Sequence, residues 1–282
     1  MDYELDAEAL TALGHPGRLA VFRLLARRAP HGVRPSEIAE ALDLKPNTLS
    51  VYVTTLTRAG ILTTWREGRS VYYGIDLKRV GALVDFLVND CCRGRPELCE
   101  PLAARSLQRL AAHRDAGRRN VLFVCSGNSA RSQFAEAILN RDGNGRFHAY
   151  SAGTKPNRRL NPEAASVLTA HGHDTAGLKP KAIASFERPG APIMDYVITV
   201  CDQAANEDCP PLPGLPLTAH WGIPRPSAVE GNDRAAAFAA AYDAIAERLE
   251  RFMALPVETL DALSLQNELD AIGGSRVAGK RV

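Results

Sequence analysis

The stretch VLFVCSGNSARSQFAEAILN, residues 121–140, restricts the fold more than any other part of the chain. It begins with a short apolar run of β-branched and aromatic residues, which is typical of a buried strand. A polar loop follows, and after the loop the chain is expected to enter a helix. A strand that passes through a loop into a helix is the repeating unit of a parallel sheet, and such a loop lies at the carboxyl edge of the strands.

The loop itself predicts an oxyanion site, because Arg131 follows Cys125 with the spacing Cys-x5-Arg. Successive backbone N–H groups and the helix N-terminus form a cradle for a tetrahedral anion. We expect this cradle to consist of Ser126, Gly127, Asn128, Ser129 and Ala130. The same field favours the thiolate form of Cys125, and Arg131 can bind two oxygens of the anion at once. Ser132 can donate a hydrogen bond to the thiolate, and Asn128 tolerates the left-handed backbone that such a loop needs.

Beyond the loop, strands and helices alternate. FHAYSAG and YVITVC have the composition of strands, whereas PEAASVLTAHG and RAAAFAAAYDAIAERLERFMAL have the pattern of helices. This alternation predicts an α/β domain in which helices cover both faces of a parallel sheet.

The segments CSGNSARSQFAEAI, YSAG, VITVCDQAANEDCP and HWGIP resemble the low-molecular-weight protein tyrosine phosphatase fold and, within it, the arsenate reductases. The resemblance covers about residues 119–270 and implies a parallel four-stranded sheet. It also implies a thiol relay in which Cys125 attacks arsenate and Cys201 attacks Cys125, releasing arsenite. Cys209 then takes over the disulfide and presents it to an external thioredoxin- or glutaredoxin-like reductant. No tightly bound cofactor is expected.

One position departs from this family pattern. Phosphatases of the fold carry an Asp-Pro pair whose Asp protonates the leaving group, whereas here Arg225 precedes Pro226 in GIPRPSA. Arg225 weakens the phosphatase interpretation and leaves the proton donor unassigned, with Glu230 and Asp233 nearby in the sequence. Two alternatives to a reductase therefore stay open: a protein tyrosine phosphatase and a non-catalytic oxyanion sensor.

The N-terminal part predicts a winged helix-turn-helix domain, mostly helical with a β-wing. Residues 7–29 have apolar residues at mostly helical spacing around GHPG, which predicts two helices. PSEIAEALDL and PNTLSVYVTTLTRAG predict two short helices with a tight turn between them.

The outward face of the second of these helices can reach base edges and phosphates in a major groove. This face comprises Asn47, Thr48, Ser50, Val51, Tyr52 and Thr54. ILTTWREGRSVYYGI predicts a hairpin with Arg66 and Arg69 at its tip, where a wing contacts the DNA backbone. The alternative is a small helical domain with a surface hairpin and no ligand.

The segments ALGHPGRLAVFRLL and PNTLSVYVTTLTRAGIL, together with the wing, resemble the ArsR/SmtB family of metal-responsive repressors over about residues 5–92. The resemblance implies a winged-helix homodimer on a near-palindromic operator, from which an effector metal releases it. It also implies that LKRVGALVDFLVNDCC is the last helix of the domain and pairs with the first helix across the dimer.

Three of the six cysteines fall within CCRGRPELC, at Cys91, Cys92 and Cys99. Gly94 and Pro96 break the helix, so the chain can fold back and bring the third thiol toward the first two. Three thiolates suit a soft, three-coordinate centre such as As(III) or Sb(III), whereas zinc normally takes a fourth ligand. Some arsenic-responsive members of the family carry a similar segment, which implies As(III) as the effector. The alternative is that the three cysteines are incidental.

The length of 282 residues allows two domains. We expect a DNA-binding domain over 1–100, a helical linker over 101–118, the reductase-like domain over 119–270 and a tail over 271–282.

Residues 9–82 carry 11 basic and 5 acidic residues, a net charge of +6, whereas residues 120–282 carry 16 basic and 18 acidic residues, a net charge of −2. Only the first part is therefore expected to contact a polyanion. The start MDYELDAEAL argues against a secretory signal, and no apolar run suits a membrane span, so we expect a cytoplasmic protein. Together these expectations describe an arsenite-responsive repressor fused to an arsenate reductase.

Overall fold

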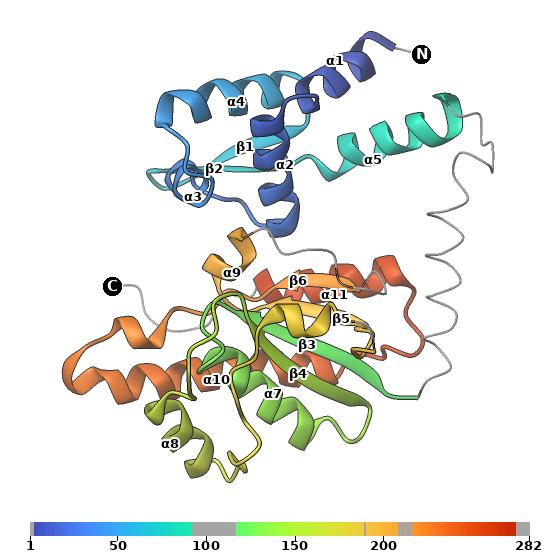
Figure 1. The fold of residues 1–282 in the computed structure, drawn as a ribbon. Helices are drawn as coiled ribbons and strands as arrows, with labels where there is room; N and C mark the ends of the chain where they lie inside the picture. Colours follow the sequence, from blue (N-terminus) through green and yellow to red (C-terminus); the bar gives the residue numbers. More distant parts are fainter. Residues whose placement is uncertain (1–2, 92–116, 189, 208–211, 213–215, 275–282) are drawn as a thin grey trace. The chain divides into compact units, whose positions relative to one another are not determined.

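The computed structural model describes residues 3–91, 117–188, 190–207, 212 and 216–274. The chain divides into two compact units, Met1–Gln108 and Arg109–Val282 (Figure 1). Most of the expected linker, residues 101–116, lies outside the described residues, as does the tail from residue 275 onward.

The N-terminal unit consists of helices and one hairpin, as predicted. Its elements are α1 (Tyr3–Leu13), α2 (Pro16–Arg28), α3 (Pro35–Ala41), α4 (Pro46–Arg58), β1 (Leu62–Glu67), β2 (Ser70–Ile75) and α5 (Leu77–Asp85). A π-helical turn, Phe86–Cys91, continues α5. Three of the helices begin at a proline, whose fixed φ suits the first turn and whose missing N–H needs no partner there. Buried leucine, isoleucine and valine side chains of α2, α3 and α4 form one core.

The hairpin pairs β1 with β2 in antiparallel register, from Leu62 opposite Ile75 to Glu67 opposite Ser70. Gly68 at the turn has a φ of 60°, a left-handed conformation that glycine adopts without strain. The predicted wing is therefore present, and its turn lies where the sequence placed it.

The C-terminal unit has a four-stranded parallel sheet in the order β4-β3-β5-β6, which confirms the predicted fold class (Figure 1). The strands are β3 (Arg119–Cys125), β4 (Phe147–Gly153), β5 (Tyr196–Thr199) and β6 (Leu217–His220). The helices are α7 (Arg131–Asp142), α8 (Pro162–Ala170), α9 (Asp202–Asn206), α10 (Arg234–Met253) and α11 (Ala262–Gly274). Short 3-10 turns occupy Ile183–Phe186, Pro226–Ala228 and Gly231–Asp233.

The sheet order brings two cysteines to one edge. The end of β3 is Cys125, and its neighbour β5 ends two residues before Cys201. Val124 is opposite Thr199 in the parallel register, and the N–H of Val200 donates to the carbonyl of Val124 at 2.8 Å. Because parallel strands end at the same edge, both thiols lie at the carboxyl edge of the sheet.

Helices pack on this sheet around a continuous apolar core. α7 contacts β3 and β4, α10 packs against α7 and α8, and α11 packs against β6. The last five residues of β3 are fully buried, as expected for VLFVC. None of the helices in the described part of the chain combines the length and apolarity that crossing a membrane requires.

Candidate functional site

Cys125 lies where β3 passes into the predicted loop, and donors surround its sulfur. The backbone N–H of Asn128 donates to Cys125 Sγ at 3.1 Å, and Ser132 Oγ lies 3.0 Å from the same sulfur. The thiol is only 2% exposed. Helix α7 starts at Arg131, so the loop leads directly into a helix N-terminus. This arrangement stabilises negative charge on the sulfur and on an anion bound next to it.

The segment after β4 fixes the loop backbone. Carbonyl oxygens of the loop accept N–H groups from four residues of that segment at 2.8–3.1 Å: Thr154, Lys155, Asn157 and Asn161. Gly153 makes the close approach possible, because a Cβ there would lie 2.8 Å from the carbonyl oxygen of Ser126. Loop geometry therefore depends on a neighbouring strand as well as on the loop's own residues.

Asn128 occupies the left-handed position that the sequence predicted, with a φ of 46°. Its side-chain amide Nδ2 donates to Ser132 Oγ and to Ser151 Oγ, both at 2.8 Å. Its Oδ1 accepts the backbone N–H of Lys181 at 2.6 Å. Because an amide nitrogen can only donate, Ser132 Oγ accepts from it and keeps its own proton for Cys125 Sγ. Asn128 thus orients the hydroxyl group that stabilises the thiolate.

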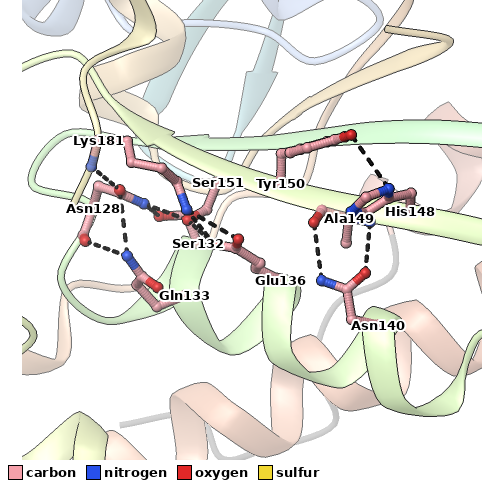
Figure 2. Close-up of polar contacts among 10 residues, drawn as sticks. All are labelled: Asn128, Ser132, Gln133, Glu136, Asn140, His148, Ala149, Tyr150, Ser151 and Lys181. Atoms are coloured by element: carbon pink, nitrogen blue, oxygen red, sulfur yellow. Dashed lines mark hydrogen bonds and ion pairs between the residues drawn. The ribbon is translucent and has the colours of Figure 1, made fainter. Parts of the chain in front are cut away.

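A charged pair continues this network away from the loop (Figure 2). The hydroxyl of Ser151 donates to Glu136, and the ammonium Nζ of Lys181 lies 3.0 Å from both carboxylate oxygens of Glu136. These three residues come from β4, α7 and a loop, and none of them was predicted from the sequence. The only local signal is that Ser151 belongs to YSAG, since the contacts themselves depend on the tertiary fold.

We expect Lys181→Met to destabilise the C-terminal unit by about 1–3 kcal/mol, because the mostly buried carboxylate of Glu136 would lose its cation. Urea denaturation of the full chain measures this change. Lys179→Met removes the same charge at an exposed position and should change stability by less than about 0.5 kcal/mol. Equal midpoints for the two variants would contradict the assigned role of Lys181.

Cys201 is the second buried thiol of the described residues, and it lies at the same edge of the sheet as Cys125. Its Sγ caps α9 by accepting the N–H of Ala204 at 3.4 Å. Burial raises the pKa of this thiol, and the charge of Cys125 raises it further. The guanidinium of Arg131 and the backbone N–H of Ser126 act in the opposite direction. Cys125 and Cys201 are therefore close enough to influence each other, whereas Cys209 lies outside the described residues.

A pocket of about 110 Å³ opens above Cys125 and is rich in cations. The loop forms its base, and Arg131, Lys155, Arg225 and Gln203 line its walls. Arg131 also donates to the carbonyl of Ile223 at 3.0 Å, which anchors its guanidinium at the HWGIP segment. Arg225 and Pro226, which stand where the phosphatases of the fold carry an Asp-Pro pair, also line the pocket. Among the described residues that line the pocket, none carries a carboxylate, and neither Glu230 nor Asp233 is among them.

The predicted metalloid site is described only in part. Cys91 is exposed at the end of the π-helical turn, whereas Cys92 and Cys99 lie outside the described residues. Within the part of the chain that is described, no three His, Cys, Asp or Glu side chains form a metal site. The triad therefore stays a prediction.

The predicted DNA-contacting residues lie on α4 and the hairpin. Four of the α4 residues are exposed, namely Asn47, Ser50, Val51 and Thr54, and so are Arg66 and Arg69 of the hairpin. Thr48 is half-buried. Tyr52 is also half-buried, and its ring packs 5.1 Å from the His15 ring and against Gly17, where a Cβ would lie 2.5 Å from the ring. The ring of Tyr52 therefore contributes to packing inside the unit.

Comparisons with known proteins agree with this division of the chain. Residues 120–266 match the family described as low molecular weight phosphotyrosine protein phosphatase, and residues 13–64 match a helix-turn-helix domain. An arsenate reductase of Bacillus licheniformis is 34% identical over 137 residues, which are 48% of this chain and 95% of that protein. An arsenate reductase of Bacillus subtilis is 33% identical over 134 residues, 47% of this chain and 93% of that protein. Among solved structures, the thioredoxin-dependent arsenate reductase of Corynebacterium glutamicum is 25% identical, covers 56% of this chain and 74% of its own, and has a TM-score of 0.37.

Proposed function

The chain belongs to the low molecular weight phosphotyrosine protein phosphatase family, and from that premise we propose that it is an arsenite-responsive repressor fused to a thiol-dependent arsenate reductase. The comparisons show a helix-turn-helix domain joined to an arsenate reductase-like domain. We further propose a thiol relay, an arsenite effector and an operator DNA target for these two domains.

One observation carries the reductase half of the proposal. A second buried thiol, Cys201, lies at the same edge of the sheet as Cys125, and none of the described residues lining the pocket is a carboxylate. A phosphatase of this kind needs a general acid for the leaving group and a water molecule. A reductase needs a second thiol that can attack the first. The residues around Cys125 therefore favour reduction over hydrolysis.

The proposed reaction uses these groups in turn. The loop N–H groups and Arg131 hold arsenate, and the Cys125 thiolate attacks arsenic while one oxygen leaves as water after protonation. Cys201 then attacks Cys125 Sγ, the sulfur–arsenic bond breaks, and its electron pair reduces As(V) to As(III), which leaves as arsenite. Cys209 attacks Cys201 and frees Cys125, and an external dithiol of the thioredoxin or glutaredoxin type reduces the Cys201–Cys209 disulfide.

Arsenite formation by the purified chain tests this half directly. With thioredoxin, thioredoxin reductase and NADPH, we expect arsenate-dependent NADPH oxidation and an equal amount of arsenite. Hydrolysis of p-nitrophenyl phosphate without arsenate reduction would favour the phosphatase alternative. Altered DNA affinity on adding arsenate or phosphate, without consumption of either, would favour an oxyanion sensor.

The regulatory half of the proposal rests on α4, the hairpin and the charge of the N-terminal unit. We propose that the exposed face of α4 contacts operator bases and that Arg66 and Arg69 contact the phosphate backbone. Large apolar side chains are exposed on α1 and α5, namely Leu5 and Leu10 on the first helix and Leu77 and Val84 on the second. We propose that these side chains are covered by a second copy of the chain, which gives a homodimer.

Arsenite is expected to release the chain from DNA taken from the region upstream of its own coding sequence. Fluorescence anisotropy measures this release. The triple variant Cys91→Ser/Cys92→Ser/Cys99→Ser should stay bound, because three thiolates are needed to hold As(III). The matched control, Cys125→Ser/Cys201→Ser/Cys209→Ser, should dissociate as the unmodified chain does. Release of the first variant by arsenite would show that the effector site is elsewhere.

A further inference from the structure

Arg225 lines the pocket above Cys125, on a segment whose backbone is held from both sides. It directly precedes the 3-10 turn Pro226–Ala228, whose proline is buried. Two positions before it, the carbonyl of Ile223 accepts the guanidinium of Arg131 at 3.0 Å. The segment that carries Arg225 is therefore anchored both to the core of the C-terminal unit and to Arg131 of the oxyanion site.

The guanidinium of Arg225 is only partly used by hydrogen bonds within the described residues. Its Nε donates to Ser227 Oγ at 3.1 Å, and Ser227 lines the same pocket. In the described part of the chain, its two terminal nitrogens form no hydrogen bond, and the side chain has no carboxylate partner. Arginine stays charged at any pH at which proteins are folded. The pocket wall therefore presents a cation with two NH2 groups that can bind an anion.

A tetrahedral oxyanion bound on the loop has one oxygen that points away from the loop. The backbone N–H groups and Arg131 hold the oxygens that face them. Because the attacking and leaving atoms of such a displacement lie in line, the leaving oxygen is on the side opposite Cys125 Sγ. Besides Arg131, the described cations that line the pocket are Lys155 and Arg225. Lys155 is already paired with Glu207 at 3.0 Å, so Arg225 is the cation left for this fourth oxygen.

We propose that Arg225 contacts the fourth oxygen and thereby makes the pocket selective for free inorganic oxyanions over phosphate monoesters, an inference that rests on the proposed function. In a free oxyanion the fourth oxygen is charged or carries only a proton, so it accepts hydrogen bonds from a guanidinium. In a monoester the same oxygen carries an organic group, which fills the space next to it and weakens it as an acceptor. Arg225 is then a specificity-determining residue, placed where the phosphatases of the fold carry the Asp of their Asp-Pro pair.

Two ligands of equal charge isolate this contact. Inorganic phosphate and phenylphosphonate are both mainly dianions at about pH 8, but in phenylphosphonate a phenyl group replaces the fourth oxygen. Neither ligand is reduced or hydrolysed by thiols. Isothermal titration calorimetry of the fully reduced chain gives the Kd of each ligand. We expect phosphate to bind about tenfold more tightly than phenylphosphonate, since only phosphate offers an oxygen to Arg225.

Variants of two arginines complete the test. Arg225→Gln should raise the Kd of phosphate about tenfold and that of phenylphosphonate by less than about threefold, because only phosphate loses a charge-assisted hydrogen bond. Arg225→Lys keeps the charge and should recover part of the phosphate affinity. The matched control is Arg159→Gln, which removes an exposed arginine that stands between the pocket residues Asn157 and Asn161 and does not itself line the pocket. It should change both Kd values by less than about twofold.

The possible results separate this inference from the proposed function. An equal loss of affinity for both ligands in Arg225→Gln, or an unchanged Kd of phosphate, would overturn the contact with the fourth oxygen alone. No phosphate binding by the unmodified chain would overturn the oxyanion site and the inference with it. Arsenate-dependent NADPH oxidation is measured in parallel. Selectivity for phosphate without arsenate reduction would contradict the proposed reductase and leave the role of Arg225 standing.

Discussion

Replacing Cys125 by serine should lower the rate of arsenite formation by about a thousandfold or more. A serine hydroxyl stays protonated at neutral pH and is a poor nucleophile toward arsenic, whereas the thiolate is the form that the loop stabilises. The loop should keep its geometry, because the N–H of Asn128 and the hydroxyl of Ser132 can hydrogen-bond an oxygen as well as a sulfur. Chemistry is therefore lost while anion binding is kept.

Two measurements separate this loss from misfolding. The urea midpoint of the C-terminal unit should change little, and calorimetry should still detect phosphate binding to Cys125→Ser. Cys91→Ser, a change of the same type at an exposed thiol of the other unit, should leave the reduction rate unchanged. Retention of a tenth or so of the activity by Cys125→Ser would mean that another group attacks arsenate.

Cys201→Ser should abolish repeated turnover while leaving the first step intact. The variant can still form the bond between Cys125 and arsenic, but it lacks the sulfur that breaks this bond and reduces the metalloid. We expect steady-state arsenite formation with thioredoxin to fall by about a hundredfold or more. Mass spectrometry should detect the arsenate adduct or an intact Cys125 thiol in place of a Cys201–Cys209 disulfide.

The pH dependence of the unmodified chain gives an independent check on Cys201. Burial raises the pKa of this thiol, so only a small fraction is thiolate near neutral pH. The rate of arsenite release in a single turnover should therefore rise with pH above neutrality, until the pH passes the raised pKa. A rate of arsenite release that falls over this pH range would argue against Cys201 as the attacking group.

Hydrolysis of p-nitrophenyl phosphate by Cys201→Ser tests the phosphatase alternative. If the variant hydrolyses this substrate fast enough to serve as the physiological activity, the phosphatase alternative gains support.

Patterns within one segment predicted local structure well. FHAYSAG forms β4 over Phe147–Gly153 as predicted; burial alternates over its first four residues, and its last three residues are all buried. YVITVC was predicted as one strand, but β5 ends at Thr199. The reason is that Cys201 caps α9 and is no longer available to extend the strand.

Contacts between distant segments could not be predicted in the same way. The pair of Glu136 and Lys181 joins α7 to a residue 45 positions later, and no periodicity in either segment indicates it. Helix α11 was not predicted either. It is held by its contacts with β6, and the sequence of the helix does not indicate those contacts. Cys125, Arg131 and Ser132 were identified from the sequence because they lie close together in one segment. Ser151 and Lys155 could be assigned to the site only from the tertiary structure, which brings their segment to the loop.

The packing of α11 against β6 affects where the reductase-like unit can be cut. β6 is the last strand of the sheet, and an exposed sheet edge invites pairing with a strand of another molecule. Gln266 donates to the Thr218 carbonyl at 2.8 Å, and Trp221 donates to the Leu269 carbonyl at 3.0 Å, so α11 covers this edge. A fragment that stops at residue 266, where the family match ends, would lose half of that cover and become prone to self-association. We therefore expect the isolated C-terminal unit to stay monodisperse only if it extends through Gly274, the last residue of α11.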